Sequence, residues 1–315
     1  MLINVNSYRT WCDYEFDGRL HPYEGNVIWC NPEDIHKLFK LLEPHPDYKV
    51  IVVSAGSDYS IRLQKEHPVN ADILKMAERI NWQAILAAKD YINVSIPAAN
   101  YKDCNITDEY SIKIDAYTIA TFNKIPQNVV TWFCANADFF HPVLQFIPYG
   151  ANIDTESNGI LKYYKKPEDK TKLVYVNFRL NSSYRKTLLD FFQHYKYDFM
   201  TLRTESIDVD TYYQELSEHK YAIVPEGNGI DSYRFIESLA VGTVPIVMSS
   251  RWAYNAYVAG FPIAPIHNLH LFNEETFKIT EEHKLHDKLN GDLLTEEYWR
   301  GKILGAKKLL EANNV

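Results

Sequence analysis

The sequence is most informative at residues 220–250, which read KYAIVPEGNGIDSYRFIESLAVGTVPIVMSS. Apolar runs open and close this stretch, at 220–224 and 244–248, and predict two buried strands. Between them, residues 232–241 place apolar side chains at helical spacing and predict a helix. A strand, a loop, a helix and a second strand in this order are typical of a parallel α/β sheet.

The loop of this unit, PEGNG at 225–229, uses two of the 12 glycines in the chain. Glycine allows the backbone to approach a ligand closely and to point its N–H groups at it. Asp231 or Ser232 can cap the helix that follows, and the N-terminus of a helix favours an anion. The candidate ligand-binding residues of this loop and helix start are therefore Glu226, Gly227, Asn228, Gly229 and Ser232.

Two charged residues of the predicted helix, Arg234 and Glu237, lie three positions apart and share one face. Such a pair is often a surface ion pair, but here it follows a glycine-rich loop. A guanidinium group suits a diphosphate, and a carboxylate suits the paired hydroxyls of a ribose. We therefore expect both side chains to face a ligand cleft.

The alternation of predicted strands and helices continues along the rest of the chain, and a polar segment divides it into two blocks. Strands are predicted at 26–30, 49–54, 91–96, 129–134, 143–147, 172–178 and 197–202, and helices at 71–88, 183–195, 210–218 and 295–312. Residues 151–171 are polar and lysine-rich, so they are the best linker candidate. We expect an N-terminal domain at 1–150, a C-terminal domain at 172–294 and a late helix at 295–315.

Residues 225–247 resemble the donor-binding motif of GT-B glycosyltransferases, closest to the exostosin-like group. The matching residues are Pro225, Gly227, the RFIESL run at 234–239 and the GTVPIV run at 242–247. The resemblance implies two Rossmann-like doubly wound domains that face a cleft, in which the final helix crosses back to the first domain. It also implies that Glu237 binds the donor ribose and that Arg234 helps to hold either the diphosphate or the loop at the end of the helix. The E-x7-E pattern of such enzymes does not fit, because Gly229 stands eight positions before Glu237.

A second match lies at the start of the C-terminal domain, where residues 175–185 read YVNFRLNSSYR. In GT-B folds the first strand of the donor domain points its carboxyl end at the phosphates. Arg179 and Arg185 follow that end here. We expect Arg185, in the first turn of the helix, to pair with the leaving diphosphate.

The acceptor side needs a base that takes the proton of the acceptor hydroxyl. Asp58 is the first choice, because it follows the strong strand at 49–54 and so lies at the carboxyl end of that strand. Asp138 and His141, after the strand at 129–134, are the alternatives. Each also has a structural interpretation. A lone aspartate commonly forms a turn, and a lone histidine is more often a structural hydrogen-bonding residue.

Charge, apolar runs and cysteine spacing limit the classes of function that this protein can have. Lysine and arginine number 33 against 41 aspartates and glutamates, a net charge of −8, which counts against a dedicated nucleic-acid binder. No run approaches the ~18 apolar residues of a membrane helix, and the start lacks a signal-peptide pattern. Cys12, Cys30, Cys104 and Cys134 form no C-x-x-C pair, which favours a reducing, cytoplasmic location. The only D-x-D triplet, at 208–210, opens a helix, so we expect no metal and no cofactor beyond the donor.

Three hypotheses follow. The first is a glycosyltransferase that moves a sugar from a nucleoside diphosphate sugar to a glycan or glycoside hydroxyl, with arginines and backbone N–H groups holding the diphosphate. The second keeps this donor but modifies a hydroxylated base in DNA, as some phage enzymes do. The third is a sugar-nucleotide epimerase, or a sugar-nucleotide-binding protein without turnover.

Overall fold

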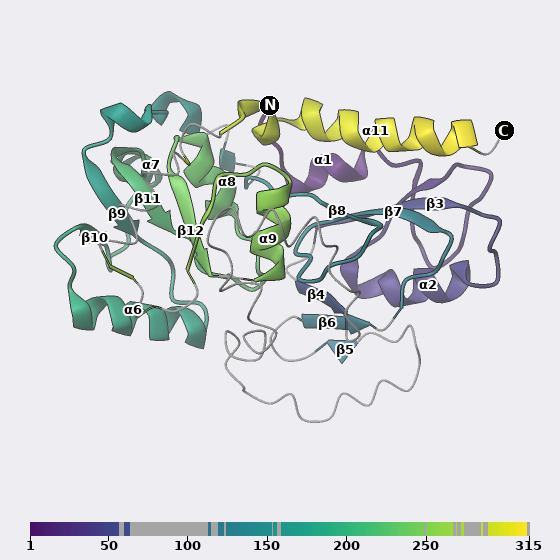
Figure 1. The fold of residues 1–315 in the computed structure, drawn as a ribbon, viewed down its shortest axis with the longest axis horizontal. Coiled ribbons are helices and arrows are strands. Elements are labelled where there is room, and N and C mark those ends of the chain that lie inside the picture. The colour runs from purple at the N-terminus through teal and green to yellow at the C-terminus, as the bar shows by residue number, and fades with distance from the viewer. Residues whose placement is uncertain are drawn as a thin grey trace.

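The computed structural model describes residues 1–56, 60–63, 113–114, 119–122, 124–152, 154–155, 159–248, 250–266, 269, 272–273, 285 and 289–313. These residues form an α/β protein with two parallel five-stranded sheets, as the alternating patterns predict. The sheets lie side by side in Figure 1, the N-terminal one at the right and the C-terminal one at the left.

The first sheet has the order β1-β2-β3-β7-β8, and every neighbouring pair is parallel. Its strands are β1 (Tyr14–Glu15), β2 (Val27–Trp29), β3 (Val50–Ser54), β7 (Val129–Cys134) and β8 (Leu144–Phe146). All of β3 is buried because elements cover both faces. Helix α2 (Ile35–Leu42), after the 3-10 turn η1 (Pro32–Asp34), packs in the cluster on one face, and α1 (Val5–Arg9) in the cluster on the other.

The second sheet has the order β10-β9-β11-β12-β13 and is also parallel throughout. Its strands are β9 (Lys172–Val176), β10 (Met200–Leu202), β11 (His219–Ile223), β12 (Val244–Met248) and β13 (Ala264–Ile266). The first strand in sequence thus lies between the second and the third, so the chain reverses its direction of travel across the sheet beside β9. This order is that of a flavodoxin-like doubly wound fold.

Helices cover both faces of the second sheet. They are α6 (Ser183–Tyr195), α7 (Val209–Glu218), α8 (Tyr233–Ala240) and α9 (Arg251–Val258). Helix α6 packs in one apolar cluster with Val174 and Ile246, whereas α7 and α8 pack in the cluster that holds Tyr175 and Val247. Three of the four begin with a side-chain cap from Ser182, Asp208 or Ser250, which satisfies a backbone N–H that the helix leaves unpaired.

A third, small sheet has the order β4-β6-β5, formed by β4 (Ser60–Leu63), β5 (Lys113–Ile114) and β6 (Ile119–Phe122). A parallel bridge between Ile61 and Ala137 joins it to the chain that follows β7. The sequence did not predict these strands, and the predicted elements at 71–88 and 91–96 lie outside the described residues.

The carboxyl ends of the two large sheets meet. The backbone N–H of Ile230, after β11, donates to Oγ of Ser60 (2.9 Å), and that of Asp231 donates to Oδ1 of Asn136 (2.8 Å). One apolar cluster runs through both halves and includes Val53 and Trp252. The loops where α/β sheets bind their ligands are therefore in direct contact across the junction.

Helix α11 (Glu296–Asn313) lies along the first sheet, although it follows the second in sequence. The 3-10 turn η7 (Gly291–Leu294) leads into it, and the N–H of Ile3 donates to the carbonyl of Leu294 (2.8 Å). Further along the helix, Lys307 pairs with Asp13. Figure 1 shows this helix running from the N-terminus across the top of the first sheet.

The predicted linker at 151–171 packs closely where it is described. It contains two 3-10 turns, η3 (Ile160–Tyr163) and η4 (Pro167–Asp169), and Ile160 is fully buried. Lys170 is buried as well, and its Nζ donates to the carbonyls of Ser217 (2.8 Å) and Val241 (3.0 Å) at the ends of α7 and α8. Burial lowers the pKa of this ammonium to about 7.

Over the described residues, no helix combines the length and the apolarity that crossing a membrane requires.

Candidate functional site

The order of the second sheet locates the candidate site. Ligands of open α/β sheets bind beyond the carboxyl ends of the strands, at the point where the strand order reverses. That point lies beside β9 and β11, whose ends run into residues 177–179 and 224–229. These are the two segments that the sequence singles out.

Arg185 fastens these two segments together. Its Nε donates to the carbonyl oxygen of Glu226 (2.8 Å), its Nη2 to that of Pro225 (3.2 Å) and its Nη1 to that of Arg179 (3.2 Å). The side chain is 6% exposed. Arg185 therefore holds the backbone of the glycine loop in place through the carbonyl oxygens of Pro225 and Glu226. The Arg179 side chain is exposed beside it.

The loop itself is tight. The N–H of Gly227 donates to the carbonyl of Gly229 (2.8 Å), and a Cβ atom at Gly227 would lie 3.3 Å from Nη2 of Arg185. Glycine at 227 thus allows the loop to close onto the guanidinium group. Asn228 is exposed, whereas Gly229 is buried against the junction of the two halves.

Buried polar atoms without a hydrogen-bond partner among the described residues gather around this loop. They include the Tyr184 hydroxyl, Oγ of Ser232 and Nε of Arg234. Buried polar atoms are paired in most proteins, so three in one neighbourhood indicate a place that can bind a polar ligand. Ser232 is the N-cap of α8 but makes no capping bond, which leaves its hydroxyl available.

Two arginines, Arg185 and Arg234, lie close enough in this neighbourhood to influence each other. Burial, followed by the proximity of Arg234, lowers the pKa of Arg185 to about 10. Arg234 lies over the ring of Tyr212, with Cζ 5.5 Å from the ring centroid, a cation–π contact. The hydrogen bonds of the Arg185 guanidinium given above all go to neutral carbonyls, so its charge is not cancelled by those partners.

Glu237 lies one turn further along α8. Its Oε1 accepts from Oγ1 of Thr155 (3.3 Å) and its Oε2 from the hydroxyl of Tyr212 (3.2 Å). Burial raises the pKa of this carboxyl, while Arg234 acts in the opposite direction. The carboxylate is therefore held by two hydroxyl groups, and each oxygen retains a second lone pair for another donor.

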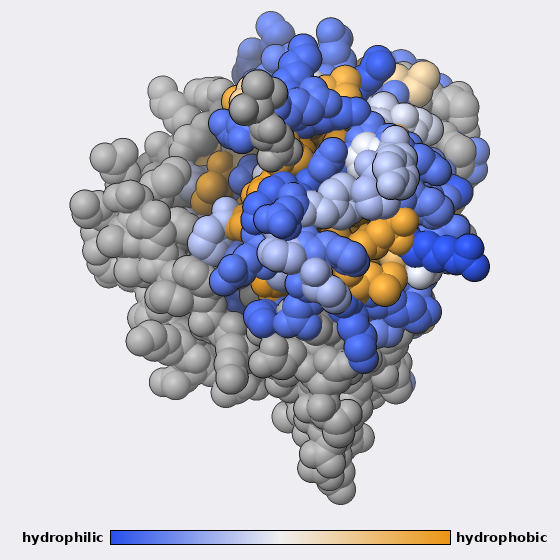
Figure 2. All heavy atoms as spheres, turned by 90° about the vertical axis from the view of Figure 1, so that its right-hand side faces the viewer, coloured by the Kyte–Doolittle hydropathy of each residue, from blue (hydrophilic) through white to orange (hydrophobic). Residues whose placement is uncertain are grey.

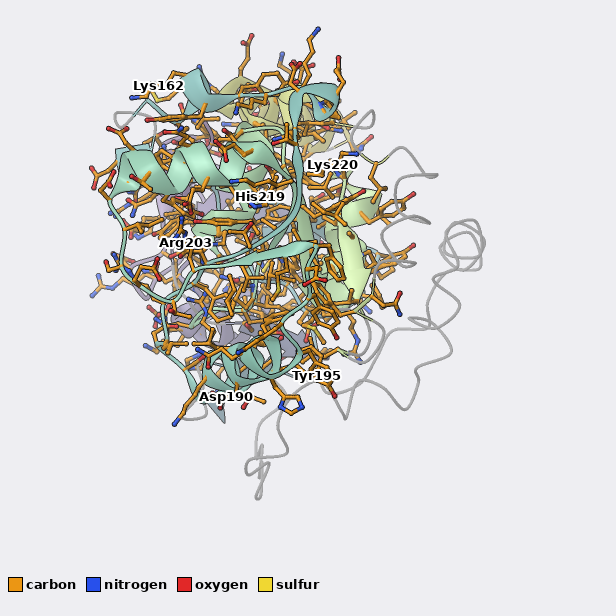
Figure 3. The ribbon with its side chains drawn as sticks, turned by 90° about the vertical axis from the view of Figure 1, so that its left-hand side faces the viewer. Lys162, Asp190, Tyr195, Arg203, His219 and Lys220 are labelled. Carbon is orange, nitrogen blue, oxygen red and sulfur yellow. The ribbon has the colours of Figure 1, made fainter. Side chains whose placement is uncertain are left out.

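A hydrogen-bonded polar layer supports the end of β9. The hydroxyl of Tyr175 donates to Oε2 of Glu215 (2.8 Å), and Arg203 binds the same carboxylate through Nε at 3.0 Å. Nδ2 of Asn177 donates to the Tyr175 hydroxyl (3.1 Å). Figure 3 labels Arg203 and His219, which approach Glu215 from the end of β10 and the start of β11.

The acceptor-side candidates have different surroundings. Asp138 is 5% exposed, and its Oδ1 accepts from the N–H groups of Arg251 (3.0 Å) and Trp252 (3.4 Å) at the start of α9. It therefore joins the end of β7 to a helix of the second sheet. His141 is half-buried, and its Nδ1 accepts from the N–H of Val143 (3.3 Å). Asp58 lies outside the described residues.

The sequence did not single out several residues that contribute to the site. Thr155 and Tyr212 contact Glu237 from segments that are distant in the chain, so no local pattern marks them. Asn136 adopts a positive φ of 58°, uncommon outside glycine, and its side chain holds the loop after β11. The sequence signal for it was an asparagine two positions after a buried strand.

No group of three or more His, Cys, Asp or Glu side chains in the described part of the chain could hold a metal ion. Comparison with models of known protein families finds no match, and comparison with curated proteins finds no significant match.

Proposed function

We propose that this protein is a glycosyltransferase of the GT-B type, which moves a sugar from a nucleoside diphosphate sugar to an acceptor hydroxyl without a metal ion. The observation that carries the proposal is that two buried polar atoms, Ser232 Oγ and Arg234 Nε, have no hydrogen-bond partner among the described residues and lie beside a glycine loop at the switch point of the second sheet. Two neighbouring arginines make this place attractive to a diphosphate.

Each part of the site has a role in this proposal. The start of α8, with Ser232 and Arg234, binds the diphosphate and stabilises its charge as the sugar–oxygen bond breaks. Glu237 accepts hydrogen bonds from the ribose hydroxyls. Arg185 is a positioning residue, because its N–H groups bind the loop carbonyls rather than facing a ligand.

The acceptor lies across the junction, on the side of the first sheet. Asp58 and His141 are the proposed bases, and we assign Asp138 to the attachment of α9, because its Oδ1 already accepts two backbone N–H groups. The acceptor hydroxyl attacks the sugar carbon, the base takes the hydroxyl proton, and the nucleoside diphosphate leaves with the bonding electrons.

Thermal shift with UDP, GDP, ADP and CDP, each with and without its common sugars, tests the donor site. A ligand at 100 times its Kd adds about 2.7 kcal/mol to the free energy of unfolding. We expect at least one nucleotide to raise the Tm of the wild type, to raise that of Lys186→Ala equally, and to leave that of Arg234→Ala unchanged. The proposal fails if no nucleotide shifts the wild type.

Turnover assays then separate the alternatives. An epimerase converts its donor without any acceptor, whereas a transferase needs an acceptor to release the diphosphate at full rate. A DNA-modifying enzyme would shift duplex DNA in a gel, with strong salt dependence.

A further inference from the structure

An apolar groove lies between α11 and the first sheet, away from the switch point of the second sheet. It is a hollow of about 620 Å³ between the helix, at Gly301, Gly305 and Leu309, and the strands β7 and β8. A second hollow of about 390 Å³ shares Thr131, Ala306 and Leu309 with the first and extends toward the end of the helix. The two together form one open groove along about three turns of α11, from Gly301 to Asn313.

The groove remains open because the helix presents small residues to it. Outside the neighbouring backbone of the helix itself, no atom of the described residues lies within 4 Å of the positions that Cβ atoms at Gly301 and Gly305 would occupy. Glycine in the interior of a helix is destabilising relative to alanine, and packing within this chain does not require either one. Leu309, at the edge of the groove, is 68% exposed.

The charge at this groove is opposite to that of the chain as a whole. Its charged lining residues are Lys49, Lys302 and Lys308, and no acidic side chain lines either hollow. The chain as a whole carries a net charge of −8. Glu311 of the same helix instead lies 4.0 Å from Lys307, outside both hollows. The groove therefore combines an apolar lining with lysines as its only charged lining residues among those described.

We propose that this face docks on an anionic lipid bilayer, with Leu309 and a lipid acyl chain sharing the groove and the three lysines binding headgroups. Lysine stems can lie along apolar surface while their ammonium groups reach the phosphate level. The lysines are spread along the helix and the adjoining strand. They can therefore bind several lipid headgroups at once, whereas a single carboxylate of a partner would reach only one of them. Figure 2 shows apolar residues reaching the surface among hydrophilic ones on the end of the molecule where α11 terminates.

Vesicle flotation tests this proposal with the full chain. The probes are vesicles of phosphatidylcholine alone and of phosphatidylcholine mixed with phosphatidylserine. We expect the wild type to float with the mixed vesicles and not with the neutral ones, and to be released as the salt concentration rises. Failure to float with the mixed vesicles, or equal flotation with both kinds, would overturn the proposal.

Matched variants locate the surface. The double variant Lys302→Glu/Lys308→Glu and the single variant Leu309→Asp should each lower vesicle binding at least about tenfold. The control Lys166→Glu/Lys186→Glu changes the net charge equally at exposed sites of the other half and should bind as the wild type does. Equal loss in the control, or unchanged binding in the groove variants, would contradict the assignment. The nucleotide-induced Tm shift should be the same in all four proteins, so a failure here is distinguishable from a failure of the donor site.

Discussion

The guanidinium group of Arg185 donates from Nε to the carbonyl oxygen of Glu226 across 2.8 Å, and this bond joins the first turn of α6 to the loop after β11. The two segments are about 40 residues apart in the sequence. Both leave the carboxyl edge of the second sheet, where strands β9 and β11 are neighbours. The bond therefore fixes the glycine loop at the one place on this sheet where the strand order reverses.

Replacement of Arg185 tests that role. Arg185→Ala removes three hydrogen bonds from a buried side chain, so we expect the free energy of unfolding to fall by about 2–4 kcal/mol. Arg185→Lys should restore little, because an ammonium group cannot reproduce the fork of the guanidinium. Chemical denaturation measures the loss, and Lys186→Ala on the exposed side of the helix is the control. A stability equal to that of the wild type would show that the loop does not depend on Arg185.

Glu237 is expected to matter for turnover more than for folding. Glu237→Ala should lower turnover at least about tenfold, because it removes the proposed ligand of the ribose hydroxyls, while the protein stays folded, because the fold loses only the two hydrogen bonds from Thr155 and Tyr212. Tyr212→Phe removes only one of the two hydroxyls and should have a smaller effect. Kinetics with the donor identified by thermal shift provide the measurement. Wild-type turnover in Glu237→Ala would remove the ribose-binding role.

Two variants of Asp138 distinguish a role of its carboxylate in capping α9 from a role as the catalytic base. If its carboxylate caps α9, Asp138→Ala should cost about 1 kcal/mol of stability, and more where burial leaves N–H groups unpaired. Asp138→Asn keeps an acceptor oxygen and should retain most of both stability and turnover. A loss of turnover of a hundredfold or more in a stably folded Asp138→Asn would make it the base after all.

The junction should respond to pH through Asp231. This residue is buried, its Oδ2 accepts from the N–H of Tyr149 (2.7 Å), and burial raises its pKa to about 7. A carboxyl whose pKa is higher in the folded state stabilises the fold fully below pH ~4 and loses that contribution as the pH rises through 7. Asp231→Asn does not ionise, so its Tm relative to the wild type should be higher at pH 8 than at pH 4. A Tm difference that does not change with pH would contradict this interpretation.

The sequence predicted most of the regular elements because their signals are local. The strands at 129–134 and 244–248 and the helix at 183–195 have the predicted bounds. The strand predicted at 197–202 is shorter, Met200–Leu202, because the chain turns just before it, where the N–H of Met200 donates to the carbonyl of Tyr197 (3.1 Å). Helix α9 was missed, since an aromatic run after β12 gives no clear period.

The candidate site was only partly predictable, for a physical reason. The loop at 225–229 and the residues Arg234 and Glu237 carry a local pattern of glycine and charge. The partners of Arg185 are backbone carbonyls, which any sequence possesses, so its positioning role could not be predicted. Likewise the bond from the Arg251 N–H to Asp138 joins two halves of the chain that only the fold brings together.

The most direct measurement is a crystal structure with the nucleoside diphosphate that thermal shift selects. We expect the diphosphate at the start of α8, within hydrogen-bond distance of Arg234 and Ser232, with the ribose hydroxyls at Glu237. A diphosphate bound elsewhere, with the Arg234 side chain turned away from it, would show that the start of α8 is not the donor site.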